Sequence, residues 1–380
     1  MSNLVLYRKY RPQKFSEVVG QEHVVTTLLN AIAGGKIAHA YLFCGPRGCG
    51  KTTVARLLAK AANCERDNGP EPCNKCASCL EIMENRSMDI IEIDAASHRG
   101  IDEIRELREG VRFGPSKSKY KVFILDEAHQ LTSGAANALL KMLEEAPSHA
   151  IFILATTEPQ KMIPTIISRC QRFDFRKITV PEMIKRLGKI AKKENVEMEK
   201  EVLAMIASAS GGALRDAESL LSQILSFASE GKTVKREDVK SFLGIIEREI
   251  IGDFVESLLK DKAADSLKIM EDSFNQGIGP EDFYENVVFY LREMMILKIV
   301  SGREGERGAE PLMNSMLTRL TTEEIERVKE QIKDISIEDI KQIVDFFLQA
   351  GERVRFSPIP QLPLEVAVAE TVENLRKKQK

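Results

Sequence analysis

The stretch that decides the fold reads Gly45-Pro46-Arg47-Gly48-Cys49-Gly50-Lys51-Thr52. It fits the pattern G-x-x-x-x-G-K-S/T of phosphate-binding loops. The apolar run 40–43 before it is long enough for a strand, and residues 53–60 after it have helical spacing. The start of such a helix attracts phosphate oxygens through its free N–H groups and its dipole. The sequence therefore predicts a binding site for a nucleoside triphosphate, formed by this loop and Thr53.

Two side chains of the loop have separate tasks in this interpretation. Lys51 is expected to reach the β- and γ-phosphates, and the hydroxyl of Thr52 is expected to coordinate Mg²⁺. The glycines let the backbone curl closely around the anion.

Length and composition limit the class of protein. The 380 residues predict two or three domains, and 29% charged residues with a net charge of −2 exclude a globally basic nucleic-acid-coating protein. The most apolar long segment, residues 287–300, contains three charged residues and is expected to be a core helix rather than a membrane span. Arg8, Lys9 and Arg11 are followed by no apolar segment, which argues against a signal peptide and favours the cytoplasm. There the seven cysteines would be reduced thiols or metal ligands.

The first part of the chain alternates short apolar runs with helical patterns, which is typical of a parallel sheet with helices on both faces. Strands are expected at 89–93, 122–126, 151–155 and 171–175, besides the one before the loop, and helices at 101–110 and 132–146. The predicted fold class is thus an α/β P-loop module over residues 1–178.

Strand patterns disappear after residue 180. Helices are expected at 181–195, 198–210, 212–229 and 235–243, and long amphipathic helices follow, interrupted by a polar loop at 301–308. We therefore expect a small helical domain at 179–243, an all-helical domain at 244–370 and a frayed tail at 371–380.

A second apolar strand, 122–126, ends in Asp126 and Glu127. Beside a P-loop, Asp126 could hold Mg²⁺ and Glu127 could act as the general base toward an attacking water. The alternative is a pair of acids that only stabilises a helix N-terminus. The P-loop favours the catalytic interpretation.

Three further polar residues could complete the chemistry. Thr157 follows the strand at 151–155 and could bond the attacking water or the γ-phosphate. Arg169 ends a short helical segment and could enter a neighbouring subunit's nucleotide site, although most surface arginines have no such task. Arg215, next to Leu214 at the start of a helix, could reach back to the phosphates.

Cys64, Cys73, Cys76 and Cys79 follow the spacing C-x8-C-x2-C-x2-C within an insertion at 64–79. Two thiolates at C-x-x-C spacing can hold one metal from a tight turn, and two more complete a tetrahedron. Structural Zn²⁺ is the favoured occupant, with an iron–sulfur cluster as the rival.

The loop at 95–102 precedes a helix, and Arg99 within it could contact a DNA phosphate. An ordinary capped loop is the alternative.

Taken together, these motifs and the segments Tyr7-Arg8-Lys9-Tyr10-Arg11-Pro12, Val18-Val19-Gly20-Gln21, Ser168-Arg169-Cys170 and Leu214-Arg215-Asp216 resemble AAA+ ATPases of the clamp-loader clade, in particular the γ/τ subunits of bacterial DNA polymerase III. The resemblance covers residues from about 4 to 370. It implies an ATPase module, a lid and a C-terminal collar. It also implies that Thr157 is the sensor-1 residue, Arg215 the sensor-2 residue and Arg169 the trans-acting arginine finger, and that Arg11, Pro12, Val18 and Val19 surround the adenine.

The same resemblance implies ATP, Mg²⁺ and Zn²⁺ as cofactors. The implied partners are δ, δ′ and further copies of γ/τ in a pentamer, a sliding clamp and a primed DNA junction at the replisome, with no membrane. A branch-migration type of AAA+ motor and a non-hydrolysing loader subunit are the alternatives. Apart from the ATPase acids we find no carboxylate pair of a polymerase. The chain ends about where a shorter γ-type form would, and the sequence leaves open whether it is such a form or a part of a longer one.

Overall fold

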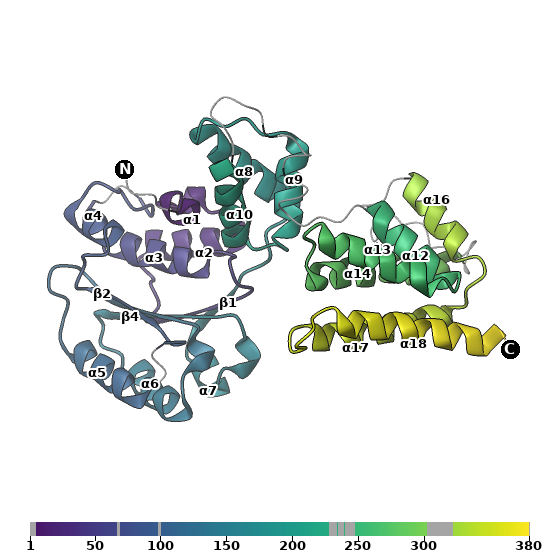
Figure 1. The fold of residues 1–380 in the computed structure, drawn as a ribbon. Helices are drawn as coiled ribbons and strands as arrows, with labels where there is room; N and C mark the ends of the chain where they lie inside the picture. Colours follow the sequence, from purple (N-terminus) through teal and green to yellow (C-terminus); the bar gives the residue numbers. More distant parts are fainter. Residues whose placement is uncertain are drawn as a thin grey trace. The chain divides into compact units, whose positions relative to one another are not determined.

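The computed structural model describes residues 5–66, 69–97, 100–227, 234, 239, 248–301 and 322–379. It divides into two compact units, Met1–Arg236 and Glu237–Lys380 (Figure 1). Three expectations fall wholly or largely outside the described residues: the DNA contact by Arg99, the helix at 235–243 and the polar loop at 301–308.

A five-stranded parallel sheet organises the first unit. Its strands are β1 (Ala40–Cys44), β2 (Ile90–Asp94), β3 (Lys121–Asp126), β4 (Ala150–Thr156) and β5 (Gln171–Asp174), in the spatial order β2-β3-β4-β1-β5. The parallel sheet expected from the alternating pattern is confirmed. Because all strands run the same way, the ends of β1, β3 and β4 meet at one edge, where ligands of open α/β sheets bind.

Helices cover both faces of this sheet (Figure 1). One face packs against α2 (Glu22–Ala33) and α3 (Lys51–Ala62), and the other packs against α5 (Ile101–Arg112), α6 (Ser133–Glu144) and α7 (Pro164–Ile167). Successive residues of β3 explain why this strand is apolar throughout: Val122 and Ile124 join the first core, whereas Phe123 and Leu125 join the second. Thr132 caps α6, as its position before the apolar pattern predicts, by accepting a hydrogen bond from the N–H of Ala135 at 3.3 Å.

Short elements connect these layers. They are α1 (Leu6–Lys9), α4 (Ala77–Met83) and the 3₁₀ turns η1 (Phe15–Glu17), η2 (Ala128–Gln130) and η3 (Pro159–Lys161).

Three helices follow the sheet within the first unit: α8 (Val180–Lys193), α9 (Lys200–Ala209) and α10 (Leu214–Phe227). A capping box between Thr179 and Glu182 begins α8. The N-terminal segment binds to these helices, because Lys9 and Tyr10 both donate to the carboxylate of Glu194, at 2.7 and 2.5 Å.

The second unit is entirely helical in its described ranges. It contains α12 (Arg248–Leu259), α13 (Ala263–Asn275), α14 (Pro280–Ser301), α16 (Thr322–Gln331), α17 (Ile337–Val354) and α18 (Leu362–Gln379), which bury a common apolar core. The expectation of a frayed tail at 371–380 is wrong, because α18 continues to Gln379. The helix persists because Thr371 and Val372 are buried and Arg376 pairs with Asp261 at 2.8 Å.

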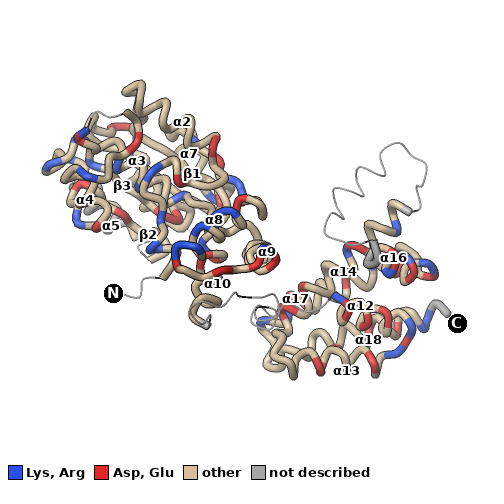
Figure 2. Tube along the Cα trace, turned by 90° about the horizontal axis from the view of Figure 1, so that it is seen from above, with Lys and Arg blue, Asp and Glu red and all other residues tan. Residues whose placement is uncertain are grey.

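Lysine and arginine positions and aspartate and glutamate positions occur in both units (Figure 2). None of the helices in the described ranges combines the length and the hydropathy that crossing a lipid bilayer requires.

Candidate nucleotide site and metal centre

A cavity of ≈ 170 Å³ lies at the carboxyl edge of the sheet, where the P-loop joins β1 to α3. It brings together most of the residues predicted for nucleotide binding: Arg11, Pro12, Val18, Val19, Arg47, Gly48, Cys49, Gly50, Lys51, Thr52, Thr53, Leu214 and Arg215, with the acids Asp126 and Glu127. Gly45 and Pro46 are not among the lining residues. Their carbonyl oxygens accept hydrogen bonds from Nζ of the buried Lys51, at 2.8 and 2.9 Å.

Gly48 connects the P-loop to the helical part of the unit. Its carbonyl oxygen accepts a hydrogen bond from the N–H of Leu214 at 3.1 Å. Its φ is +74°, and a Cβ at this position would lie 2.9 Å from the Cβ of Ala213. Only glycine allows both this backbone conformation and this close approach. The first turn of α10, and with it Arg215, is thereby held at the mouth of the phosphate loop.

Thr52 and Asp126 are in direct contact, since the hydroxyl of Thr52 donates to Oδ2 of Asp126 at 2.7 Å. A hydroxyl and a carboxylate in contact beside a phosphate-binding loop are the oxygen ligands that Mg²⁺ prefers. This pair therefore fits the predicted metal position.

Glu127 has the left-handed φ of +47°, which is uncommon outside glycine. The carboxylate accepts a hydrogen bond from the hydroxyl of Thr157 at 2.9 Å and lies 3.5 Å from Nδ1 of His129. Such a backbone conformation persists only where the surroundings hold it, and it is typical of functional sites. The turn after β3 thus directs Glu127 toward the end of β4.

His129 is a residue whose role the sequence did not suggest. The ring is buried, with Nδ1 3.0 Å from Oγ1 of Thr156 and Nε2 3.3 Å from Oε1 of Glu158. It therefore links the turn that carries Glu127 to the segment that carries Thr157.

The two predicted arginines occupy different surroundings. Arg215 lines the cavity, and its guanidinium lies 4.8 Å from the ring centre of Tyr7. Arg169 does not line the cavity of its own chain. It donates to the carbonyl of Thr165 at 2.8 Å and pairs with Glu144 at 2.6 Å, on a half-exposed surface after α7.

Tyr7, Ile178 and Glu218 also line the cavity. Only Tyr7 belongs to a segment that the sequence connected with the nucleotide. Glu218 is buried, which raises its pKa despite the opposing effect of Arg186, 3.2 Å away. Neither Ile178 nor Glu218 carries a local sequence signal, because their proximity to the P-loop depends on how α8 and α10 pack.

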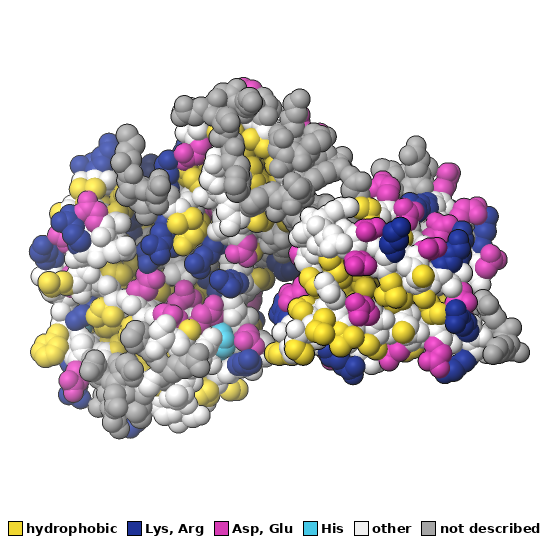
Figure 3. Space-filling view, in the orientation of Figure 1, with side chains coloured by type: hydrophobic (Ala, Val, Ile, Leu, Met, Phe, Trp, Pro, Cys, Tyr) yellow, Lys and Arg dark blue, Asp and Glu magenta, His cyan; other side chains and the backbone are white. Residues whose placement is uncertain are grey.

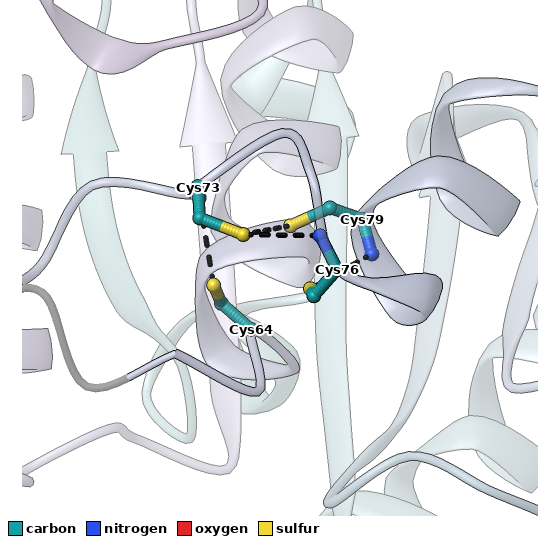
Figure 4. A group of neighbouring side chains, drawn as sticks. All are labelled: Cys64, Cys73, Cys76 and Cys79. Atoms are coloured by element: carbon teal, nitrogen blue, oxygen red, sulfur yellow. Dashed lines mark hydrogen bonds between the residues drawn. The ribbon is translucent and has the colours of Figure 1, made fainter.

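The four clustered cysteines converge, with their sulfur atoms all within 4.8 Å of one another (Figure 4). Backbone amides donate to three of these sulfurs at 3.3 to 3.4 Å: Cys73 to Cys64, Lys75 and Cys76 to Cys73, and Cys79 to Cys76. Sulfur atoms that accept N–H bonds favour the thiolate form, which is the metal ligand. The cluster is compatible with a zinc site, and four protein ligands would leave no position for a substrate.

Glu71 ties the cysteine loop to the N-terminal segment. Its carboxylate accepts hydrogen bonds from the N–H groups of Phe15 and Ser16, at 2.8 and 2.9 Å. The loop therefore supports the backbone that leads to Val18 and Val19 in the nucleotide cavity.

Three family models match the chain. Residues 20–179 match the model described as DNA polymerase III, delta subunit, residues 182–230 match DNA polymerase III clamp loader subunit, ATPase lid domain, and residues 234–377 match DNA polymerase III subunits gamma and tau domain III.

Curated relatives agree with these models. The chain is 44% identical to DNA polymerase III subunit tau of Bacillus subtilis, over 97% of this chain and 63% of that protein. It is 38% identical to DNA polymerase III subunit gamma/tau of Mycobacterium bovis, over 96% of this chain and 62% of that protein. The chain thus spans less than two thirds of the length of these relatives.

A solved structure, the RuvB Holliday junction branch migration motor of Thermotoga maritima, has a TM-score of 0.47 and 21% identity, over 64% of this chain and 79% of that one. The classification rests on the family models and the curated relatives, which together match nearly the whole chain. The chain belongs to the family of gamma and tau subunits of bacterial DNA polymerase III.

Proposed function

We propose that this chain is the ATP-driven motor subunit of a bacterial clamp loader, which opens a sliding clamp and places it on primed DNA. The observation that carries the proposal is the cavity in which the P-loop, the acids after β3 and Arg215 of α10 meet. A pocket that combines a phosphate loop, two carboxylates and an arginine from a helical lid suits a nucleotide whose binding changes the position of the lid. Membership of the gamma and tau family supports the rest.

Nucleotide binding would use groups that are already in place. The P-loop amides and Lys51 would hold the phosphates, with Arg215 approaching from α10. Arg11, Pro12, Val18 and Val19 would surround the base. Thr52 and Asp126 would hold Mg²⁺, which when bound neutralises charge on the phosphates.

Hydrolysis would begin with Glu127 as general base. The carboxylate would take a proton from a water whose oxygen attacks the γ-phosphorus, while the bond from that phosphorus to the β-phosphate oxygen breaks and ADP leaves. The hydrogen bond from Thr157 to Glu127 would orient the base and report the state of the γ-phosphate side of the cavity.

A neighbouring subunit would complete the site. Arg169 lies on the surface of its own chain, so it can reach a nucleotide only in another subunit if it acts as an arginine finger. The proposed assembly contains δ, δ′ and further copies of this subunit, with the second unit acting as the collar. ATP binding would favour the open clamp on a primer–template junction, and hydrolysis would release the closed clamp.

Steady-state ATP hydrolysis tests the proposal, measured for the chain alone and with the partner subunits, the sliding clamp and primed DNA. Strong stimulation by the complete set, abolished by Glu127→Gln, is the expected result. High activity of the chain alone that ignores the clamp would instead indicate an independent AAA+ motor. No turnover in any mixture would indicate a subunit that only assembles.

A further inference from the structure

A second cavity, of ≈ 460 Å³, lies beside the nucleotide cavity and shares Arg11, Pro12 and Thr53 with it. It is formed by the N-terminal segment, α3 and the end of α4. Four of its lining residues are basic: Arg8, Arg11, Arg56 and Lys60. The others are neutral: Pro12, Gln13, Thr53, Leu57, Ile82, Met83 and Asn85. None of the described residues that line this cavity is acidic.

Lys60 is the most deeply buried of the four, with 2% of its surface exposed. Nζ donates to the neutral amide oxygen of Gln13 at 2.8 Å, and no carboxylate pairs with it within the described ranges. A buried ammonium group is costly unless an anion compensates for the water it has lost. Its burial lowers the pKa of Lys60. Cys79, Glu17, Cys73 and Glu71 act in the opposite direction, but none of them forms an ion pair with Lys60 among the residues that the structure describes.

Arg11 is in a similar position. Its guanidinium donates no hydrogen bond and pairs with no acid among the residues that the structure describes. Burial, and then the positive charge of Arg56, lower its pKa, while Glu92 has the opposite effect. A planar guanidinium with free donors is suited to a carboxylate or a phosphate.

Arg56 pairs with Glu92, the carboxylate that acts to raise the pKa of Arg11. Its Nε and Nη2 donate to the two oxygens of Glu92 at 2.7 and 2.9 Å, and Nη1 donates to Asn85 at 3.3 Å. This bidentate pair occupies Glu92, whereas Arg8, Arg11 and Lys60 form no ion pair with a carboxylate among the residues that the structure describes.

We propose that this cavity binds an anion with several phosphate charges, at a site separate from the P-loop. Several cations around one cavity favour a multiply charged ligand over a single carboxylate, and guanidinium groups hold phosphate oxygens in pairs. The phosphates could come from a free oligophosphate or from the backbone of a nucleic acid. On the face of the first unit drawn in Figure 3, lysine and arginine side chains reach the surface in several groups.

Binding of inorganic pyrophosphate by isothermal titration calorimetry tests the proposal, with the full chain carrying Lys51→Ala so that the P-loop contributes little. We expect one binding event, weakened roughly 10-fold or more by Arg56→Gln, because a charge-assisted contact is lost. Glu92→Gln should strengthen binding several-fold, because it removes the competing carboxylate. Because a misfolded protein would not bind more tightly, a gain of affinity in Glu92→Gln remains informative even if Arg56→Gln unfolds.

Arg172→Gln is the matched control, since Arg172 also forms an arginine–carboxylate pair, with Asp174, but lines neither cavity. It should leave pyrophosphate binding unchanged. Adding a single-stranded oligonucleotide separates the two sources: displacement of pyrophosphate that requires Arg56 assigns the site to nucleic acid, and lack of displacement assigns it to a small oligophosphate. Absence of binding, or affinity that ignores both Arg56 and Glu92, would overturn the proposal. The proposal does not depend on ATP hydrolysis by this chain.

Discussion

Substitutions at Lys51 and at Arg169 are expected to have different effects, because Lys51 lines the cavity and Arg169 does not. Lys51→Ala removes the ammonium group at the phosphates, and we expect nucleotide affinity to fall by roughly 100-fold or more. Arg169→Ala should leave affinity unchanged and reduce turnover of the assembled complex by about 10³-fold. Equilibrium binding of a fluorescent ATP analogue and assembled turnover measure the two quantities. Equal loss of binding in both variants would contradict a role of Arg169 in trans.

His129 is predicted to position Glu127 rather than to contact the nucleotide. Its ring bridges Thr156 and Glu158 beside the carboxylate of Glu127. His129→Ala should lower kcat by about 10-fold and leave KM nearly unchanged, because only the orientation of the base changes. His129→Asn can keep a donor near the position of Nδ1 and should restore part of kcat. A purely structural residue would show no such rescue at equal thermal stability.

Asp89 gives a prediction for pH dependence. Burial acts to raise the pKa of its carboxyl, but N–H groups of Ser116, Ser118 and Lys117 donate to it at 2.6, 2.9 and 3.0 Å, and the net effect is a lowered pKa. A lowered folded-state pKa means that the stabilisation is present above the unfolded pKa of about 4 and is lost as pH falls through the folded value.

Asp89→Asn should therefore cost about 2 kcal/mol in the free energy of unfolding at neutral pH. The difference from the parent should shrink as the pH falls below about 4, where the carboxyl of the unfolded chain is protonated, and it should disappear once the pH is below the lowered pKa of the folded protein. Urea unfolding at a series of pH values measures this. Glu109→Gln, at an exposed position of α5, is the control. A constant difference at all pH values would show that the charge of Asp89 is not responsible.

At the scale of elements, the cysteine loop is expected to need its metal. Cys76 accepts the N–H bond that begins α4 and belongs to the four-sulfur cluster. Cys76→Ser should lower the zinc content and the unfolding midpoint of the protein by roughly 10 °C, since binding energy of a structural metal is folding energy. Metal analysis and calorimetry measure both. Cys170→Ser removes a thiol outside the cluster and should keep the zinc. A metal-free Cys76→Ser protein of unchanged stability would contradict a structural site.

The elements also show which features of the structure could be predicted from the sequence. The five strands and the helices around them could be predicted from local patterns. An apolar run between turn residues indicates a strand and a 3.6-residue period indicates a helix, and each pattern is visible within a short stretch of sequence. The P-loop, the acids after β3 and the four cysteines are equally local. Ile178, Glu218 and His129 were not found, because their roles come from residues distant in sequence. The end of α18 was misjudged for the same reason: the buried Thr371 and the pairing of Arg376 with Asp261 hold a segment whose composition suggests a tail.

For the whole molecule, the second unit has an exposed apolar surface that its own fold does not need. Phe356 is 86% exposed, and Ile359, Leu362 and Val366 beside it are 53, 44 and 40% exposed. Hydrophobic side chains also gather on the face of this unit drawn in Figure 3. Exposed apolar patches of this kind are typical of interaction surfaces. We expect this segment to contribute to assembly of the proposed loader.

Phe356→Ser should therefore keep the fold and the nucleotide affinity of the isolated chain, because Phe356 lies between α17 and α18 and its side chain is largely solvated. In a mixture with the partner subunits it should raise the concentration needed for half-maximal assembly by about 10-fold, at a cost of roughly 1.4 kcal/mol. Sedimentation velocity measures the assembly. ATP turnover should fall in parallel if Arg169 is the proposed arginine finger, because it would then act only between subunits, and an excess of partner subunits should restore the turnover. Full turnover of a variant that no longer assembles would contradict both the collar role of the second unit and the arginine-finger role of Arg169. Normal assembly of the variant would show only that the surface around Phe356 does not contribute to assembly.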